Sequence, residues 1–156
     1  MPTAAKATAA SFEGNGAADT AFSLLCELQG AHHALLACMT VMEQLTRAVE
    51  PDSTQLLKAR HKISHASLKR RQTCQRAHNY LRPKATSQDR EILRQLAALD
   101  ADYFRRSSEH LSQWPGTAAL TDWKGFRAAS ANIRRHMESA IRTEQSLLYP
   151  LLNRYR

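Results

Sequence analysis

Four blocks of apolar side chains at helical spacing constrain the fold of this chain more than any other feature. The blocks span about residues 21–49, 54–81, 88–113 and 122–152, and in each of them apolar residues recur at every third or fourth position. This period places them along one face of an α-helix. No segment alternates between apolar and polar residues as a half-buried strand does. The pattern predicts an all-α fold, an antiparallel up-down-up-down four-helix bundle.

The chain divides into a short tail and one domain. Residues 1–19 are small, polar and rich in alanine and glycine, which predicts a flexible N-terminal tail. Residues 20–156 are predicted to form the single four-helix domain, which is long enough to bury a core. At the predicted helix starts, Asp52 or Ser53 is expected to cap the second helix, and Thr121 the last.

No apolar stretch of the chain approaches the roughly 18 residues needed to span a bilayer. The N-terminus lacks the apolar run of a signal peptide. The three cysteines, Cys26, Cys38 and Cys74, are odd in number and form no Cys-x-x-Cys pair, which favours a reducing compartment. These observations predict a cytoplasmic protein without a membrane partner.

The formal charge of +8 is concentrated in residues 58–84, which hold nine of the 22 Lys and Arg and no acidic residue. One interpretation is a solvated helix face balanced by acids of neighbouring helices, among them Glu27, Glu43 and Glu91. The other is a docking surface for an acidic protein or a nucleotide ligand. Nucleic acid is not favoured, because Tyr80 is the only aromatic residue of the segment. The predicted basic surface consists of Lys58, Lys62, Lys69, Arg71 and Arg76.

Polar residues interrupt each apolar stripe, and a buried polar group must find a partner. With a rise of about 1.5 Å per residue, His32, Arg70, Asp100 and His136 are predicted near one level of the bundle. Glu144 is expected roughly 12 Å further along its helix. The predicted polar core consists of Arg70, Cys74, Asp100 and Tyr103.

Two interpretations fit these interruptions. An ion pair of Arg70 with Asp100 or Glu144 would help to fix the register of the helices. A metal or ligand site would instead draw on His32, His136 and Glu144. The ion pair is the preferred interpretation for Arg70 and Asp100, and both interpretations stay open for His32 and Glu144.

Two segments carry a resemblance to a known family. "RRHMESAIRTEQSLLYPLL" resembles the end of hemerythrin-like, HHE-type domains, with Glu144 at the acidic position and Tyr149-Pro150 as the aromatic-proline pair that closes the helix. "LQGAHHALLACMTVMEQL" resembles their first helix, where His32 or His33 matches an early ligand. The resemblance covers about residues 22–152. It implies a four-helix bundle around a di-iron centre held by histidines and bridging carboxylates.

The chain departs from the family pattern at several ligand positions. Ala140 stands where the family has a histidine one turn before the acidic residue, and the second helix offers only His78 and no carboxylate. The third helix has Asp100 or Asp102 where a histidine is expected. We therefore interpret the chain as a degenerate member of the family, whose di-iron site is largely lost and replaced by a polar or ionic core.

On this interpretation the protein is a binding or sensory module rather than an enzyme, and it needs no cofactor. The first alternative is an iron- or oxygen-handling protein with a non-standard metal site. The second is a signalling module that acts through an acidic partner or by phosphotransfer, since "SHASLKRR" resembles a histidine phosphotransfer motif with His65 as acceptor. A homo-oligomer is compatible with each of these hypotheses.

Overall fold

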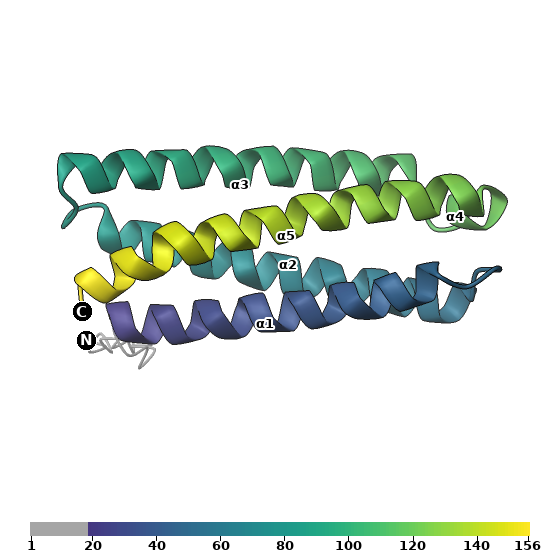
Figure 1. Cartoon of the computed structure of the whole chain (residues 1–156), viewed down its shortest axis with the longest axis horizontal. Helices are drawn as coiled ribbons and strands as arrows, with labels where there is room; N and C mark the ends of the chain where they lie inside the picture. Colours follow the sequence, from purple (N-terminus) through teal and green to yellow (C-terminus); the bar gives the residue numbers. More distant parts are fainter. Residues whose placement is uncertain (1–18) are drawn as a thin grey trace, which may run out of the picture.

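The computed structural model describes residues 19–156, and every regular element in that range is a helix. Four long helices lie side by side, each antiparallel to the one before it (Figure 1). The predicted all-α class is confirmed. Residues 1–18, nearly all of the predicted tail, lie outside the described residues. The elements are α1 (Ala21–Thr46), α2 (Ser53–Leu81), α3 (Ser87–Gln113), the short α4 (Ala118–Thr121) and α5 (Trp123–Arg154).

Side-chain caps explain where the long helices begin. Thr20 forms a capping box at the start of α1. Asp52, one of the two predicted candidates, accepts a hydrogen bond from a backbone N–H in the first turn of α2. The prediction for the last helix is wrong: Asp122 caps α5 by accepting from the Gly125 N–H at 2.9 Å, because Thr121 is taken up by the extra turn of α4.

The core runs the length of the bundle along the predicted stripes. At the end where the C-terminus lies, it is built mainly of leucines from all four long helices. Fully burying a leucine contributes about 1.5–3 kcal/mol, so these residues supply much of the stability. Val49, the last apolar residue of the first predicted block, lies beyond the end of α1 and is 89% exposed. The leucines of this cluster are Leu24, Leu25, Leu28, Leu81, Leu93, Leu96, Leu148, Leu151 and Leu152.

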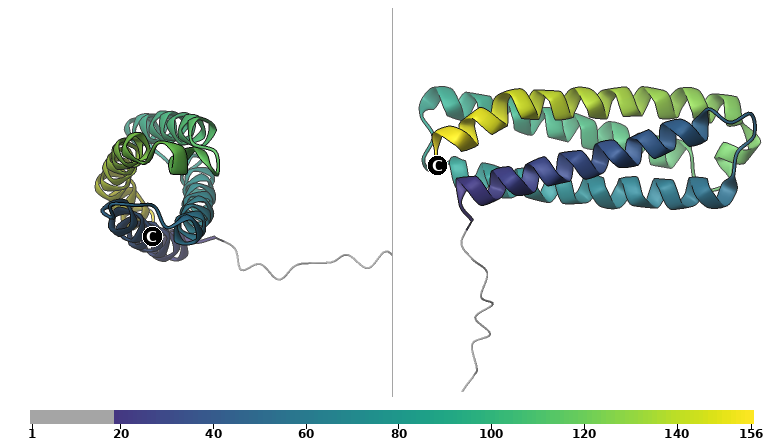
Figure 2. Two further views of the ribbon diagram at one scale, coloured as in Figure 1. Left: turned by 90° about the vertical axis from the view of Figure 1, so that its right-hand side faces the viewer. Right: turned by 60° about the horizontal axis from the view of Figure 1, so that its bottom comes forward.

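The four long helices do not pack equally. Helix α1 packs along α2 and α5, and α3 packs along α5, whereas α2 and α3 make few close contacts with each other. The end view in Figure 2 shows the four helices arranged around a common axis. The interior is therefore least closed on the side between α2 and α3. None of the helices in residues 19–156 has the length and hydropathy of a membrane span.

Candidate functional site

A buried arginine joins three helices at the middle of the bundle. Arg70 of α2 is 1% exposed, and its guanidinium donates to Glu144 Oε1 of α5 and, at 2.8 Å, to Asp100 Oδ1 of α3. The second oxygen of Asp100 is 3.3 Å from Arg71 Nε. Both ion pairs that the sequence suggested for Arg70 are therefore present. Two carboxylates offset the cost of burying one guanidinium.

His32 and Tyr149 extend this network towards α1. The Nε2 atom of His32 lies 2.5 Å from Glu144 Oε2, and its Nδ1 atom lies 2.6 Å from the Tyr149 hydroxyl. Burial raises the pKa of Tyr149, so the phenol keeps its proton and can donate to Nδ1. In the tautomer that carries its proton on Nε2, the ring accepts from the phenol at Nδ1 and donates a hydrogen bond to Glu144 from Nε2. Both oxygens of Glu144 are thus engaged, one by Arg70 and one by His32.

The third residue of the predicted metal set lies elsewhere. His136 Nε2 is 3.5 Å from Arg106 Nη1, and the structure gives it no contact with His32 or Glu144. The predicted level of His136, taken from the rise per residue, is wrong. Figure 1 shows the reason: α4 and its loops carry the chain past the end of α3, so α5 begins beyond that end of the bundle. This offset brings Glu144, rather than His136, to the level of Asp100.

The donor groups do not fit the di-iron centre that the resemblance implies. His32 and Glu144 are bonded to each other, and the guanidinium of Arg70 covers the other oxygen of Glu144. A metal ion would lie beside that guanidinium, and like charges at short range repel strongly. Within residues 19–156, no group of three or more His, Cys, Asp or Glu is arranged to hold a metal ion.

Cys74 and Tyr103, the other predicted members of the polar core, both contact Arg70. The Cys74 sulfur is 4.0 Å from Arg70 Nη1, and burial raises the pKa of this thiol far above its usual range. It is a protonated core group rather than a reactive thiolate. The Tyr103 ring centroid lies 5.3 Å from the guanidinium carbon, at cation–π distance.

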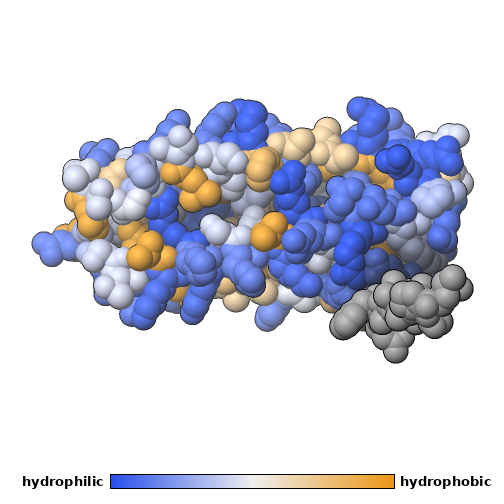
Figure 3. Space-filling view, turned by 180° about the vertical axis from the view of Figure 1, so that it is seen from behind, coloured by the Kyte–Doolittle hydropathy of each residue, from blue (hydrophilic) through white to orange (hydrophobic). Residues whose placement is uncertain are grey.

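A cavity of about 200 Å³ lies beside the network and shares its wall. Arg70, Asp100 and Tyr103 belong to both. The cavity lies between α2 and α3, which make few close contacts with each other. Figure 3 shows the rear face of the molecule, which is hollowed between hydrophobic side chains. Its walls are mainly apolar and include Met39, Met42, Ile63, Phe126, Ile133 and Met137. Hydroxyl groups line it on α2 and α3, from Ser64, Ser67, Ser107 and Ser108.

One buried donor of the network lacks a partner. Arg70 Nε is the only buried side-chain nitrogen or oxygen within residues 19–156 that makes no hydrogen bond. Leaving such a group unpaired costs about 1–3 kcal/mol.

Sequence reasoning missed two further residues at the cavity, Arg60 and His110. Arg60 Nη2 donates to the Trp114 carbonyl at 2.5 Å, and its guanidinium carbon is 5.6 Å from the Phe126 ring centroid. Burial, and then the charge of Arg60, lower the pKa of His110 to about 4, so this ring is neutral at pH 7. The run of serines on α2 and α3 was the available signal, because small polar residues facing each other leave room between helices.

The predicted basic surface is only partly neutralised by its neighbours. Arg76 pairs with Asp19, the last residue of the predicted tail, and with Glu27. The expected balance by Glu43 and Glu91 is wrong, since these residues pair with arginines of their own helices. Arg71 is half-buried and turned to Asp100 and the Phe104 ring. Three exposed lysines of α2 have no carboxylate at ion-pair distance within the described range: Lys58, Lys62 and Lys69.

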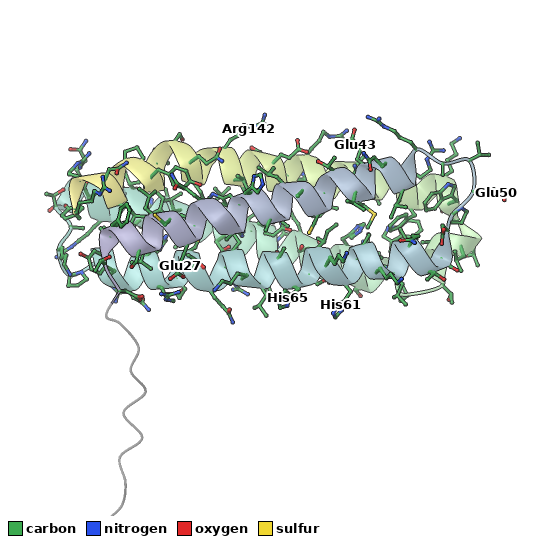
Figure 4. The ribbon with its side chains drawn as sticks, turned by 90° about the horizontal axis from the view of Figure 1, so that it is seen from below. Glu27, Glu43, Glu50, His61, His65 and Arg142 are labelled. Atoms are coloured by element: carbon green, nitrogen blue, oxygen red, sulfur yellow. The ribbon has the colours of Figure 1, made fainter. Side chains whose placement is uncertain are left out.

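Two histidines of residues 58–84 lie on the outside of the bundle, whereas His78 is half-buried. His61 and His65 are exposed, and Figure 4 shows both pointing from α2 away from the other helices. His33 is exposed as well, whereas its neighbour His32 is buried. Of the two candidates for the early family ligand, it is therefore His32 that faces the interior.

Comparison of the chain with known proteins finds no matching family model, curated protein or solved structure. The resemblance to hemerythrin-like domains therefore rests on the motifs around His32 and Glu144.

Proposed function

We propose that this protein is a hemerythrin-like bundle that binds a small organic ligand, as a binding or sensory module rather than an enzyme. In this proposal the ionic network around Arg70 takes the place of the family's metal centre. The observation that carries the proposal is the cavity of about 200 Å³ beside that network. A dry apolar cavity of about 150 Å³ already accommodates benzene, so a one- or two-ring molecule is a suitable size.

The chemistry of the walls supports the same proposal. Ligand sites are mostly apolar with a few polar groups that orient the molecule. Here the apolar surface comes from methionine, isoleucine and phenylalanine side chains, and the polar groups are serine hydroxyls and arginine side chains. The network holds the guanidinium of Arg70 in place from two sides, so this part of the cavity wall is already ordered before a ligand arrives.

Indole, a neutral two-ring compound, is a suitable first probe. We expect a saturable heat of binding in calorimetry and a rise in melting temperature, because indole binds the folded state only. Ser107→Phe, which fills the cavity from α3, should abolish both effects. Ser146→Phe, at an exposed position of α5, should preserve them. Absence of binding to the wild-type protein, or equal binding to both variants, would contradict the proposal.

The rival hypothesis of an iron- or oxygen-handling protein has its own test. After expression in iron-supplemented medium, we expect iron well below one equivalent per chain and no oxo-bridge absorption band. The physical reason is that His32 and Glu144 bind each other and Arg70 adds positive charge. Stoichiometric iron together with such a band would replace our proposal by the rival.

A further inference from the structure

The cavity carries more positive than negative charge. Four arginines line it: Arg60, Arg70, Arg71 and Arg134. Asp100 is the only carboxylate among its lining residues, and it is shared by Arg70 and Arg71. Glu144 adds a second negative charge from behind Arg70. The pairing therefore accounts for Arg70 and Arg71, whereas Arg60 and Arg134 have no carboxylate at ion-pair distance among residues 19–156.

Arg60 shows this imbalance most clearly. Its Nη2 atom donates to a neutral group, the Trp114 carbonyl, and its guanidinium lies over the Phe126 ring. Burial is the sole cause that lowers its pKa, and no Asp or Glu of residues 19–156 pairs with it. Arg60 is half-buried, so its charge is only partly hydrated. Such a group gains from an anion placed against its remaining N–H donors.

Arg134 lines the cavity from the opposite side, on α5. Its Nε donates to the Ser130 carbonyl at 3.2 Å and its Nη2 to the Thr46 hydroxyl at 3.3 Å, both neutral acceptors. Burial is the largest cause of its lowered pKa, and Glu43 and Glu138 act on it only beyond ion-pair distance. Arg60 of α2 and Arg134 of α5 thus line the same cavity, and neither pairs with a carboxylate of the described part of the chain.

We infer that the ligand of this cavity is a small organic acid, whose apolar body lies against the methionine and phenylalanine walls and whose carboxylate is bound by Arg60. This inference rests on the proposed function and names the chemical class of its ligand. A carboxylate and a guanidinium form charge-assisted hydrogen bonds, and apolar surroundings strengthen their attraction. An inorganic anion lacks the apolar body that the walls require.

A matched pair of compounds separates charge from shape. 3-Phenylpropanoate carries the carboxylate, and 3-phenylpropanamide has nearly the same shape without charge. In calorimetry at low salt, we expect the acid to bind at least about 10-fold more tightly than the amide. Equal affinity for the two compounds would overturn this inference and leave the proposed function standing. Failure of both to bind, together with a failure of indole, would overturn the proposed function itself.

Variants of the arginines test the location of the anion. Arg60→Met should remove the preference for the acid, because the affinity for the charged acid falls much more than that for the amide, whose remaining binding reports an intact cavity. Arg142→Met is the matched control, because Arg142 of α5 is exposed and points away from the bundle in Figure 4. If Arg60→Met also loses the amide, Arg134→Met provides the second variant and should weaken the preference. A preference for the acid that survives both substitutions would overturn the assignment.

Discussion

Glu144 is the residue on which the buried network depends, because it holds both Arg70 and His32. Glu144→Gln removes one of the two negative charges beside a buried guanidinium, and removal of one member of a buried ion pair typically costs about 3–5 kcal/mol. The amide oxygen can still accept one bond, so we expect a loss of about 2–4 kcal/mol in the free energy of unfolding, measured in urea.

Glu138→Gln is the control for this experiment. Glu138 lies on the same helix, is half-buried, and belongs to no ion pair within the described residues. Its substitution should change the free energy of unfolding by no more than about 0.5 kcal/mol. Equal melting behaviour of the two variants would mean that Glu144 is not buried in an ionic network.

His110 makes stability depend on pH. Its pKa in the folded protein is about 4, and about 6.5 is usual for the unfolded chain. Between these values the unfolded state binds more protons, so stability falls as the pH falls from about 6.5 to about 4. With allowance for partial exposure, the loss is on the order of 2 kcal/mol. His110→Gln should flatten the urea stability profile in this range, whereas His65→Gln, at an exposed position, should leave its slope unchanged.

Single residues show what could be predicted and what could not. The pairing of Arg70 followed from the cost of burying a charge, and both of its partners lay within the predicted stripes. The position of Glu144 along the bundle was wrong, because residue counting could not include the offset that α4 introduces. The isolation of Arg60 was not predictable at all, since it depends on which groups fail to approach it.

At the scale of the helix, two glycines make a matched pair. Gly30 lies inside α1, and a Cβ atom added there would meet no heavy atom within 4 Å. A Cβ atom at Gly125 would collide with the Asp122 carboxylate that caps α5 and would lie 2.9 Å from the Trp114 ring. Gly30→Ala should therefore raise the free energy of unfolding by about 0.5–1 kcal/mol. Gly125→Ala should lower it by about 1 kcal/mol or more through loss of the cap.

Thermal or urea unfolding of the two alanine variants distinguishes these effects. Both substitutions add the same methyl group, so the side-chain chemistry cancels and the local backbone environment decides the sign. The same sign for both variants would show that the cap of α5 does not have the geometry described.

The limits of the long helices could be predicted from the sequence to within a few residues, because capping residues and apolar stripes mark them. The four residues of α4 are too short to carry a periodic signal.

For the whole molecule, four long antiparallel helices could be predicted from the sequence, because short connections leave neighbouring helices few other arrangements. The cavity was not predictable in this way. It exists because α2 and α3 stand apart, and that separation is the outcome of packing along the other sides of the bundle. The proposed ligand therefore depends on a property that no single helix carries.

The distribution of charge over the whole molecule leads to a last prediction. Lys58, Lys62 and Lys69 are spaced by four and seven residues, so they form one exposed stripe along α2, with the paired Arg76 seven residues further on. The three lysines therefore place part of the chain's net charge of +8 on one face of the molecule. An acidic partner should bind it electrostatically, with an affinity that falls as salt displaces the contacts.

Poly-L-glutamate is a suitable probe of this stripe. We expect binding at low salt, and the triple change of Lys58, Lys62 and Lys69 to glutamine should lower the slope of log affinity against log salt by roughly two to three, about one for each contact removed. The control changes Arg47, Arg94 and Arg105 to glutamine; each of these arginines pairs with an acid three or four residues away. This variant loses the same net charge, but the salt slope should fall less. If both triple variants weaken binding to the same extent, net charge alone attracts the polymer. In that case the stripe has no role of its own, because a specific surface must depend on where its charges lie and not only on how many there are.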